Sequence, residues 1–83
     1  MSVKLYDFSS ALDYIKRGNY VRRLGWNGKG LAVGLVANIK GEPLLQPFFI
    51  IYNSNKGTYN TWVPSVSDLL AEDWIILFDK EEL

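Results

Sequence analysis

The absence of cysteine from a chain of only 83 residues sets the tightest limit on its fold. A domain this short buries only about 60% of the surface that its unfolded chain exposes, so its core is thin. Without cysteine, neither disulfides nor thiolate metal sites can strengthen that core. The fold must therefore depend on apolar packing, and a composition of 48% hydrophobic and 14% aromatic residues is sufficient for one globular domain over residues 1–83. The thin core and the many aromatic residues also predict burial against other subunits.

Charge and composition exclude several classes of function. Nine basic residues balance nine acidic ones, whereas proteins that bind DNA or RNA through phosphates usually carry a basic excess, so we expect no polynucleotide partner. Histidine is absent, which removes the commonest general base and the commonest metal ligand. We therefore expect no metal, no cofactor and no catalytic residue. Neither a signal peptide nor an apolar stretch of roughly 18 residues is present, so we expect no membrane association.

The hydrophobic pattern predicts a helix near the N-terminus. Its apolar residues have the spacing of one helical face over residues 7–17: Phe8, Ala11, Leu12 and Ile15. Asp7 is placed to cap the N-terminus of this helix. Gly18 is placed to end it in the left-handed conformation.

The remainder of the chain reads as strands with one short helix. Strands are predicted over residues 20–23, 31–37, 48–52, 58–63 and 74–78, with turns at 38–43 and 53–57. Ser65 and Asp68 have the spacing of a capping box, which predicts a helix that reaches about Ala71. The predicted class is α+β: an N-terminal helix packed on an antiparallel sheet, and a short helix before the last strand.

The first candidate binding segment is the glycine-rich stretch 21–30. Arg22, Arg23 and Lys29 are suited to phosphates. Trp26 offers a flat face on which a base can stack, and Asn27 can read a base edge or a ribose hydroxyl. The structural alternative is that Trp26 covers an edge of the core and that the two adjacent arginines are solvated. The segment lacks the phosphate-loop pattern.

The second candidate segment covers residues 61–74. Trp62 is suited to stack on a second ring, and the helix N-terminus with Ser65 and Ser67 is suited to an anion. Asp68 can accept hydrogen bonds from ribose hydroxyls or an exocyclic amine. The structural alternative explains Ser65 and Asp68 by capping alone, and Leu69, Leu70 and Trp74 by core packing.

Two sequence blocks carry a resemblance to a known family. Gly-Trp-Asn-Gly-Lys-Gly at residues 25–30 and Leu-Ala-Glu-Asp-Trp at 70–74 resemble the second type of Thoeris anti-defence protein of phages. The resemblance implies a small α+β protein that forms homotetramers. It also implies binding of glycocyclic ADP-ribose, the messenger of a bacterial TIR-domain enzyme, which such proteins hold intact. Val66 stands where a polar residue is expected, and residues 36–57 are shorter than expected and match poorly.

The resemblance implies a non-enzymatic sponge in the cytoplasm of the bacterial host. One alternative is capture of cyclic dinucleotides made by a cGAS-like defence system, which some relatives perform. A second is an enzyme that hydrolyses the same signal with Asp68, Glu72 and Asp73, although capping and surface exposure explain that acidic stretch. A third is a phage structural or adaptor protein without a ligand, whose aromatic residues serve contacts between subunits.

Overall fold

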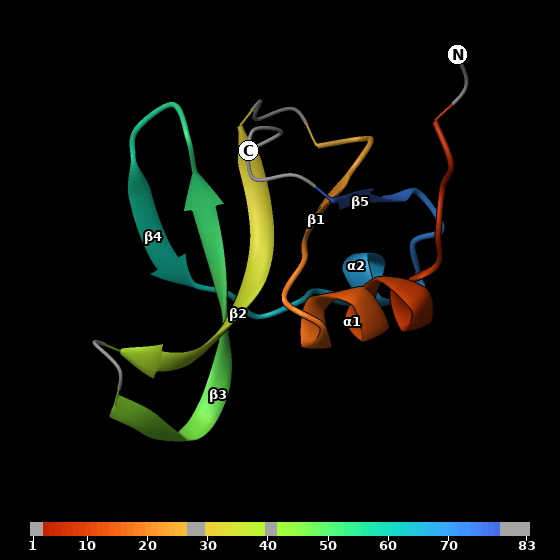
Figure 1. Ribbon diagram of the computed structural model, residues 1–83. Coiled ribbons are helices and arrows are strands. Elements are labelled where there is room, and N and C mark those ends of the chain that lie inside the picture. The colour runs from red at the N-terminus through yellow and green to blue at the C-terminus, as the bar shows by residue number, and fades with distance from the viewer. Residues whose placement is uncertain (1–2, 27–29, 40–41, 79–83) are drawn as a thin grey trace.

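Two helices and five strands form the described structure (Figure 1). The computed structural model describes residues 3–26, 30–39 and 42–78, with side chains for all of these except 37–39 and 42–46. The elements follow in the order α1 (Phe8–Lys16), β1 (Tyr20–Arg23), β2 (Leu31–Ile39), β3 (Glu42–Asn53), β4 (Thr58–Thr61), α2 (Val66–Leu70) and β5 (Trp74–Leu77). The predicted α+β class is confirmed, as is the short helix before the last strand.

Helix α1 begins and ends where its capping residues predict. The Asp7 carboxylate accepts a hydrogen bond from the Ser10 amide at 2.9 Å, which satisfies one free N–H of the first turn. Gly18 has a φ of 101°, the left-handed conformation that follows many helices. The buried face consists of Phe8, Ala11 and Ile15. The two described helices are nine and five residues long, and neither is long and apolar enough to cross a membrane.

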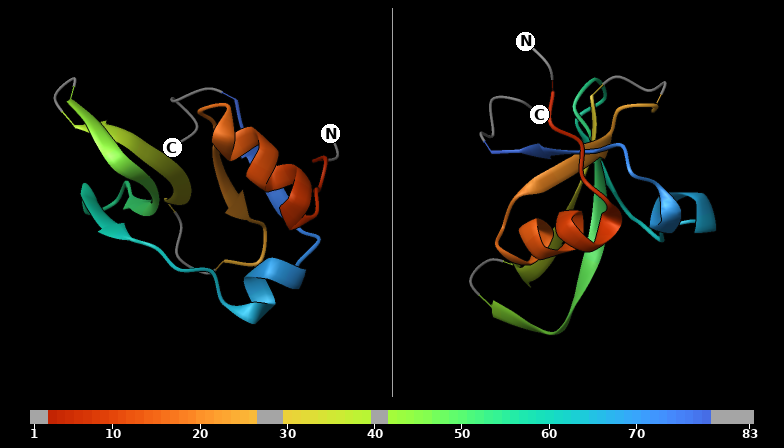
Figure 2. Two further views of the ribbon diagram at one scale, coloured as in Figure 1. Left: turned by 90° about the horizontal axis from the view of Figure 1, so that it is seen from below. Right: turned by 90° about the vertical axis from the view of Figure 1, so that its right-hand side faces the viewer.

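The five described strands form one antiparallel sheet in the order β4-β3-β2-β1-β5. Helix α1 lies against the part of the sheet formed by β1, β2 and β5, and the hairpins of β2, β3 and β4 extend away from it (Figures 1 and 2). The main core lies between α1 and this sheet and includes Val21, Val33, Trp74 and Ile76. One face of the sheet is thus covered by α1 near β1 and β5.

The hairpin of β2 and β3 is longer than predicted. The sequence predicts a turn over residues 38–43, but β2 continues to Ile39 and β3 begins at Glu42. A register shift between Val36 and Asn38 marks an irregularity in the ladder. Prolines 43 and 47 favour the shorter hairpin, because proline cannot donate to a ladder. They fit because β4 pairs with β3 only from Ile50 onward, so this half of β3 has one neighbouring strand in the described sheet.

Candidate functional site

Arg23 joins the two candidate segments. Its Nε donates to Asp73 Oδ1 at 2.9 Å, and its Nη1 donates to Asp68 Oδ1 at 3.1 Å. The Asp73 carboxylate also accepts from the Gly25 amide at 3.1 Å. Residues 21–30 and 61–74, which are far apart in the sequence, therefore meet at one place. The guanidinium of Arg23 bonds these two carboxylates, so it is not a free cation beside the loop.

Asp68 is the one buried residue of α2. Its Oδ2 accepts from the Ser65 amide at 2.9 Å, and the Ser65 hydroxyl accepts from the Asp68 amide at 3.1 Å, which confirms the predicted capping box. Burial raises the pKa of Asp68, but the hydrogen bonds from Ser65 and Arg23 outweigh that effect and lower it. Both carboxylate oxygens thus have partners within the protein, and the group is held as an anion.

Trp26 and Trp62 bring the two segments into aromatic contact. Their ring centroids lie 6.5 Å apart in an edge-to-face arrangement. Each ring also contacts Trp74, at 5.5 Å from Trp26 and 6.2 Å from Trp62, and Trp74 is fully buried. Both Trp26 and Trp62 are half-buried. Each therefore packs partly on the core and is partly exposed, which confirms for Trp26 the structural alternative that it covers an edge of the core.

Arg22 lies on the other face of the sheet. Side chains alternate along a strand, and Val21 and Arg23 occupy the face covered by α1. Arg22 pairs in register with Ile75, which belongs to the separate cluster on the opposite face. The two adjacent arginines therefore cannot act together on one side. The strand predicted over residues 20–23 already implied this separation, because successive side chains of a strand point to opposite faces of the sheet.

The remaining candidate residues divide between the described and undescribed parts of the chain. Ser65 and Ser67 are exposed at the start of α2. Core packing is confirmed for Trp74 but is wrong for Leu69 and Leu70, which are exposed because the buried side of this short helix is taken by Asp68. Asn27 and Lys29 lie outside the described residues. The ligand-binding role of all nine candidates stays a prediction.

The acidic residues after α2 are Glu72 and Asp73, and Asp73 contributes hydrogen bonds to the fold. The sequence predicts surface exposure for Asp73, but the residue is half-buried and bonds both Arg23 and the Gly25 amide. Burial raises the pKa of Asp73, and these two hydrogen bonds outweigh burial and lower it. Glu72 is exposed. Acidic residues at positions 68 and 73 share one guanidinium, an arrangement that sequence spacing alone does not reveal.

Comparison with known proteins identifies the family. The sequence profile of the Thoeris anti-defense 2-like domain matches residues 6–77, from the start of α1 through β5. The chain belongs to the Thoeris anti-defense 2-like family. Thoeris anti-defense 2 of Bacillus phage SP01 is 35% identical over 82 residues, which cover 84% of this chain and 92% of that relative. Family membership supports a phage anti-defence role directed against Thoeris.

Proposed function

We propose that this protein binds and sequesters a cyclic nucleotide-type immune signal, glycocyclic ADP-ribose, without cleaving it. It would thereby keep the Thoeris effector inactive in the cytoplasm of the infected bacterium. The observation that carries the proposal is the contact of Trp26 with Trp62, which unites two segments predicted separately to bind ligand rings. Membership of the Thoeris anti-defense 2-like family supports the identity of the pathway.

The residues of the proposed site have three roles: stacking on ligand rings, binding of phosphates and positioning of the loop. The exposed sides of Trp26 and Trp62 stack on ligand rings, a contact worth roughly 1–3 kcal/mol per base. Lys29 and the backbone amides of the glycine-rich loop bind phosphates. Arg23 acts as a positioning residue, because its bonds to Asp68 and Asp73 hold the loop against α2. These carboxylates are bonded to a guanidinium, which favours capture over hydrolysis by a carboxylate.

Capture of this kind saturates at a fixed ratio of ligand to protein. Titration of the protein with glycocyclic ADP-ribose in a calorimeter is expected to show an abrupt end point. Heat denaturation of the loaded protein is expected to release ligand of unchanged mass, which still activates the Thoeris effector. A released compound of different mass, or turnover of more than one ligand per site, would identify an enzyme instead.

Replacement of Trp26 with alanine tests the location of the site. The variant is expected to bind about 1–3 kcal/mol more weakly, because one stacking face is lost. Lys56→Ala, an exposed change in the turn after β3, is the matched control and is expected to bind as the wild type does. Circular dichroism establishes that both variants fold. A folded Trp26→Ala protein with unchanged affinity would place the ligand elsewhere.

We also propose that the protein is a homo-oligomer, a tetramer. Helix α2 supports this proposal because it buries Asp68 and exposes its apolar side chains. Val66 is 72% exposed, Leu70 is 75% exposed, and the preceding Val63 is 85% exposed. Val66 and Leu70 are four residues apart and share one side of α2, and an exposed apolar patch of this kind is typical of contacts between subunits.

Leu70→Glu is expected to shift the protein toward smaller species, because it places an unpaired charge in that patch. Light scattering at micromolar concentration measures the change in mass. Ser9→Glu, a charge introduced at an exposed position of α1, is the matched control and is expected to leave the mass unaltered. A wild-type protein that is monomeric under these conditions would contradict the proposal.

A further inference from the structure

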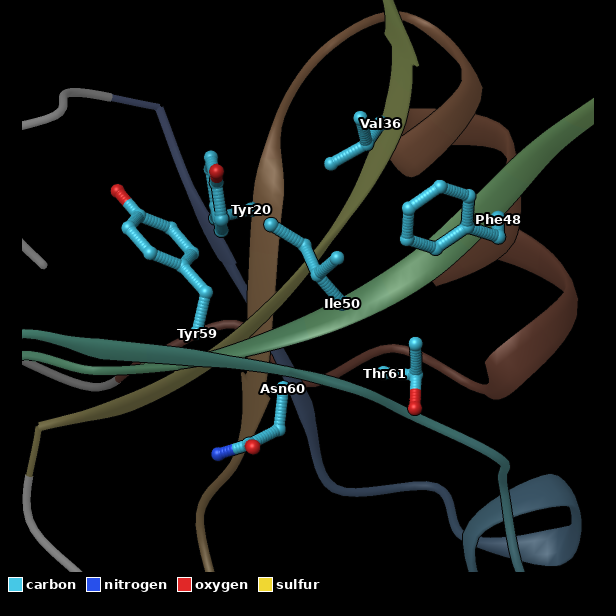
Figure 3. A pocket seen from close by; sticks show the side chains of 7 residues that line it. All are labelled: Tyr20, Val36, Phe48, Ile50, Tyr59, Asn60 and Thr61. Carbon is cyan, nitrogen blue, oxygen red and sulfur yellow. The ribbon is translucent and has the colours of Figure 1, made fainter. Parts of the chain in front are cut away.

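A hollow of about 530 Å³ lies on the sheet face opposite α1, at the end of the molecule formed by β2, β3 and β4 (Figure 3). Its lining comes from four strands: Tyr20, Val36, Phe48, Ile50, Tyr59, Asn60 and Thr61. Ile50 is nearly buried and forms the floor, with Tyr20 and Tyr59 on one side of it and Phe48 on the other. The side chain of Asn60 points away from the other six. The hollow is therefore apolar and has aromatic walls.

Gly34 gives this hollow its shape. The ladder places Gly34 beside Ile50 in β3, and the ring of Tyr20 in β1 lies over Gly34 from the other side. A Cβ at position 34 would come within 2.7 Å of that ring. The absent side chain therefore lets Tyr20 lie close to the sheet, so that its ring lines the hollow instead of standing away from it.

The polar groups at the hollow are neutral hydrogen-bonding groups. Burial raises the pKa of the Tyr20 hydroxyl, and the neighbouring Tyr59 and Tyr52 raise it further. Tyr20 is therefore a protonated donor at neutral pH. The rings of Tyr52 and Tyr59 lie 4.6 Å apart and tilted by 30°, which holds the exposed Tyr59 ring in place. The described lining contains no charged side chain.

Arg22 is a cation on this face of the sheet. It lies two residues after Tyr20 in β1, and alternation along the strand places both side chains on the same face. Among the described residues, its guanidinium has no carboxylate partner of the kind that the neighbouring Arg23 has in Asp68 and Asp73. Arg22 is thus available to an anion on the sheet face that carries the hollow.

The concave shape favours a small molecule over a second copy of the chain. A two-fold contact places the same surface on both subunits. Two hollows that face each other would leave an empty space between them, whose lining would lose its contacts. The volume of the hollow falls within the range of about 300–1,000 Å³ that is usual for small-molecule sites. Its aromatic walls suit a flat ring.

We propose that this hollow binds an uncharged planar ring, and that an anionic group attached to the ring reaches Arg22. The site is separate from the Trp26 and Trp62 contact, which lies on the face covered by α1. The proposal is therefore independent of the capture function described above. Its ligand class is a heteroaromatic ring with a single acidic substituent.

Three probes test this assignment: AMP carries both ring and phosphate, adenosine carries the ring alone, and ribose 5-phosphate carries the phosphate alone. NMR titration of the wild-type protein is expected to show that AMP shifts the amide signals of Ile50 and Tyr59. Adenosine is expected to bind about three- to tenfold more weakly than AMP, and ribose 5-phosphate is expected not to bind. Arg22→Gln is expected to make AMP and adenosine equivalent.

Variants of the walls test whether the ring of AMP occupies the hollow itself. Tyr59→Ser, at a position that is 60% exposed, is expected to weaken AMP binding about tenfold while the fold is retained. Phe48→Ser provides a second wall variant with the same expected direction. Trp26→Ala is expected to leave the shifts at Ile50 and Tyr59 unchanged.

Equal binding of ribose 5-phosphate and AMP would overturn the proposal, as would wall variants that fold and bind AMP normally. A third result would also overturn it: wild-type protein that binds no AMP, together with a Phe48→Glu variant that has a smaller assembly mass. That result would make the hollow a contact between subunits.

Discussion

Replacement of Arg23 with methionine is expected to lower the free energy of unfolding by about 3 kcal/mol at pH 7. The change removes one guanidinium from between two carboxylates whose side chains are only 13% exposed in Asp68 and 28% exposed in Asp73. Loss of the guanidinium leaves the carboxylates of Asp68 and Asp73 poorly solvated and unpaired. The cost of these unpaired charges exceeds the modest net stabilisation that a paired ion contributes. Urea denaturation measures the difference between the variant and the wild type.

The effect of Arg23→Met is expected to depend on pH. The pKa values of Asp68 and Asp73 are lowered in the folded protein, so their ionised forms stabilise it above the unfolded value of about 3.9. This stabilisation disappears as the pH falls below that value, when the carboxylates take up protons. The difference in stability between wild type and variant is therefore expected to be largest near neutral pH and to narrow toward pH 2.

A second arginine provides the matched control. Arg17 pairs with Asp13 at 2.8 Å on α1, and these side chains are 63% and 57% exposed. An exposed pair at this helical spacing contributes about 0.5 kcal/mol or less. Arg17→Met is thus expected to be nearly neutral. Equal effects of the two substitutions would show that the bonds of Arg23 to α2 do not hold the structure together.

The sequence predicts well those features that depend on neighbouring residues. The boundaries of α1, its Asp7 cap and the left-handed Gly18 follow from spacing and local hydrogen bonding. The capping box of Ser65 and Asp68 is equally local. The extent of β3 is not set locally. Pro43 is tolerated in this strand only because β4 does not pair with this part of β3.

The candidate site is only partly accessible to sequence reasoning for the same reason. Trp26 and Trp62 can each be chosen as an aromatic residue in a polar segment, but their contact depends on where α2 packs. The bond from Arg23 to Asp73 joins residues 50 positions apart and requires the pairing of β1 with β5. The hollow depends on the register of several strands, since Gly34 must lie beneath Tyr20. Spacing within one segment cannot supply that register.

Trp74→Ala is expected to produce the largest loss of stability, about 3–5 kcal/mol, the usual range for removal of a buried aromatic side chain. Trp74 is fully buried, and its ring contacts Phe8 at 5.4 Å as well as Trp26 and Trp62. Its Nε1 donates to the Asp68 carbonyl at 3.0 Å, which ties α2 to the core. Because small domains have a net stability of roughly 5–15 kcal/mol, this variant is expected to be marginal or unfolded. Thermal unfolding followed by circular dichroism measures the change.

Trp74→Phe separates the role of the ring from the role of its N–H group. Phenylalanine keeps an aromatic ring against Trp26 and Trp62 but loses the hydrogen bond to the Asp68 carbonyl. This variant is expected to fold, with a smaller loss than Trp74→Ala, and to leave α2 less firmly attached. Hydrogen exchange at the Asp68 and Leu69 amides is then expected to accelerate, while exchange in β2 stays close to the wild-type rate. Unchanged exchange in α2 would mean that Arg23 and the capping box hold this helix without Trp74. The contact between the two candidate segments would then rest on the ion pairs of Arg23, the hydrogen bond from the Gly25 amide and the contact of Trp26 with Trp62.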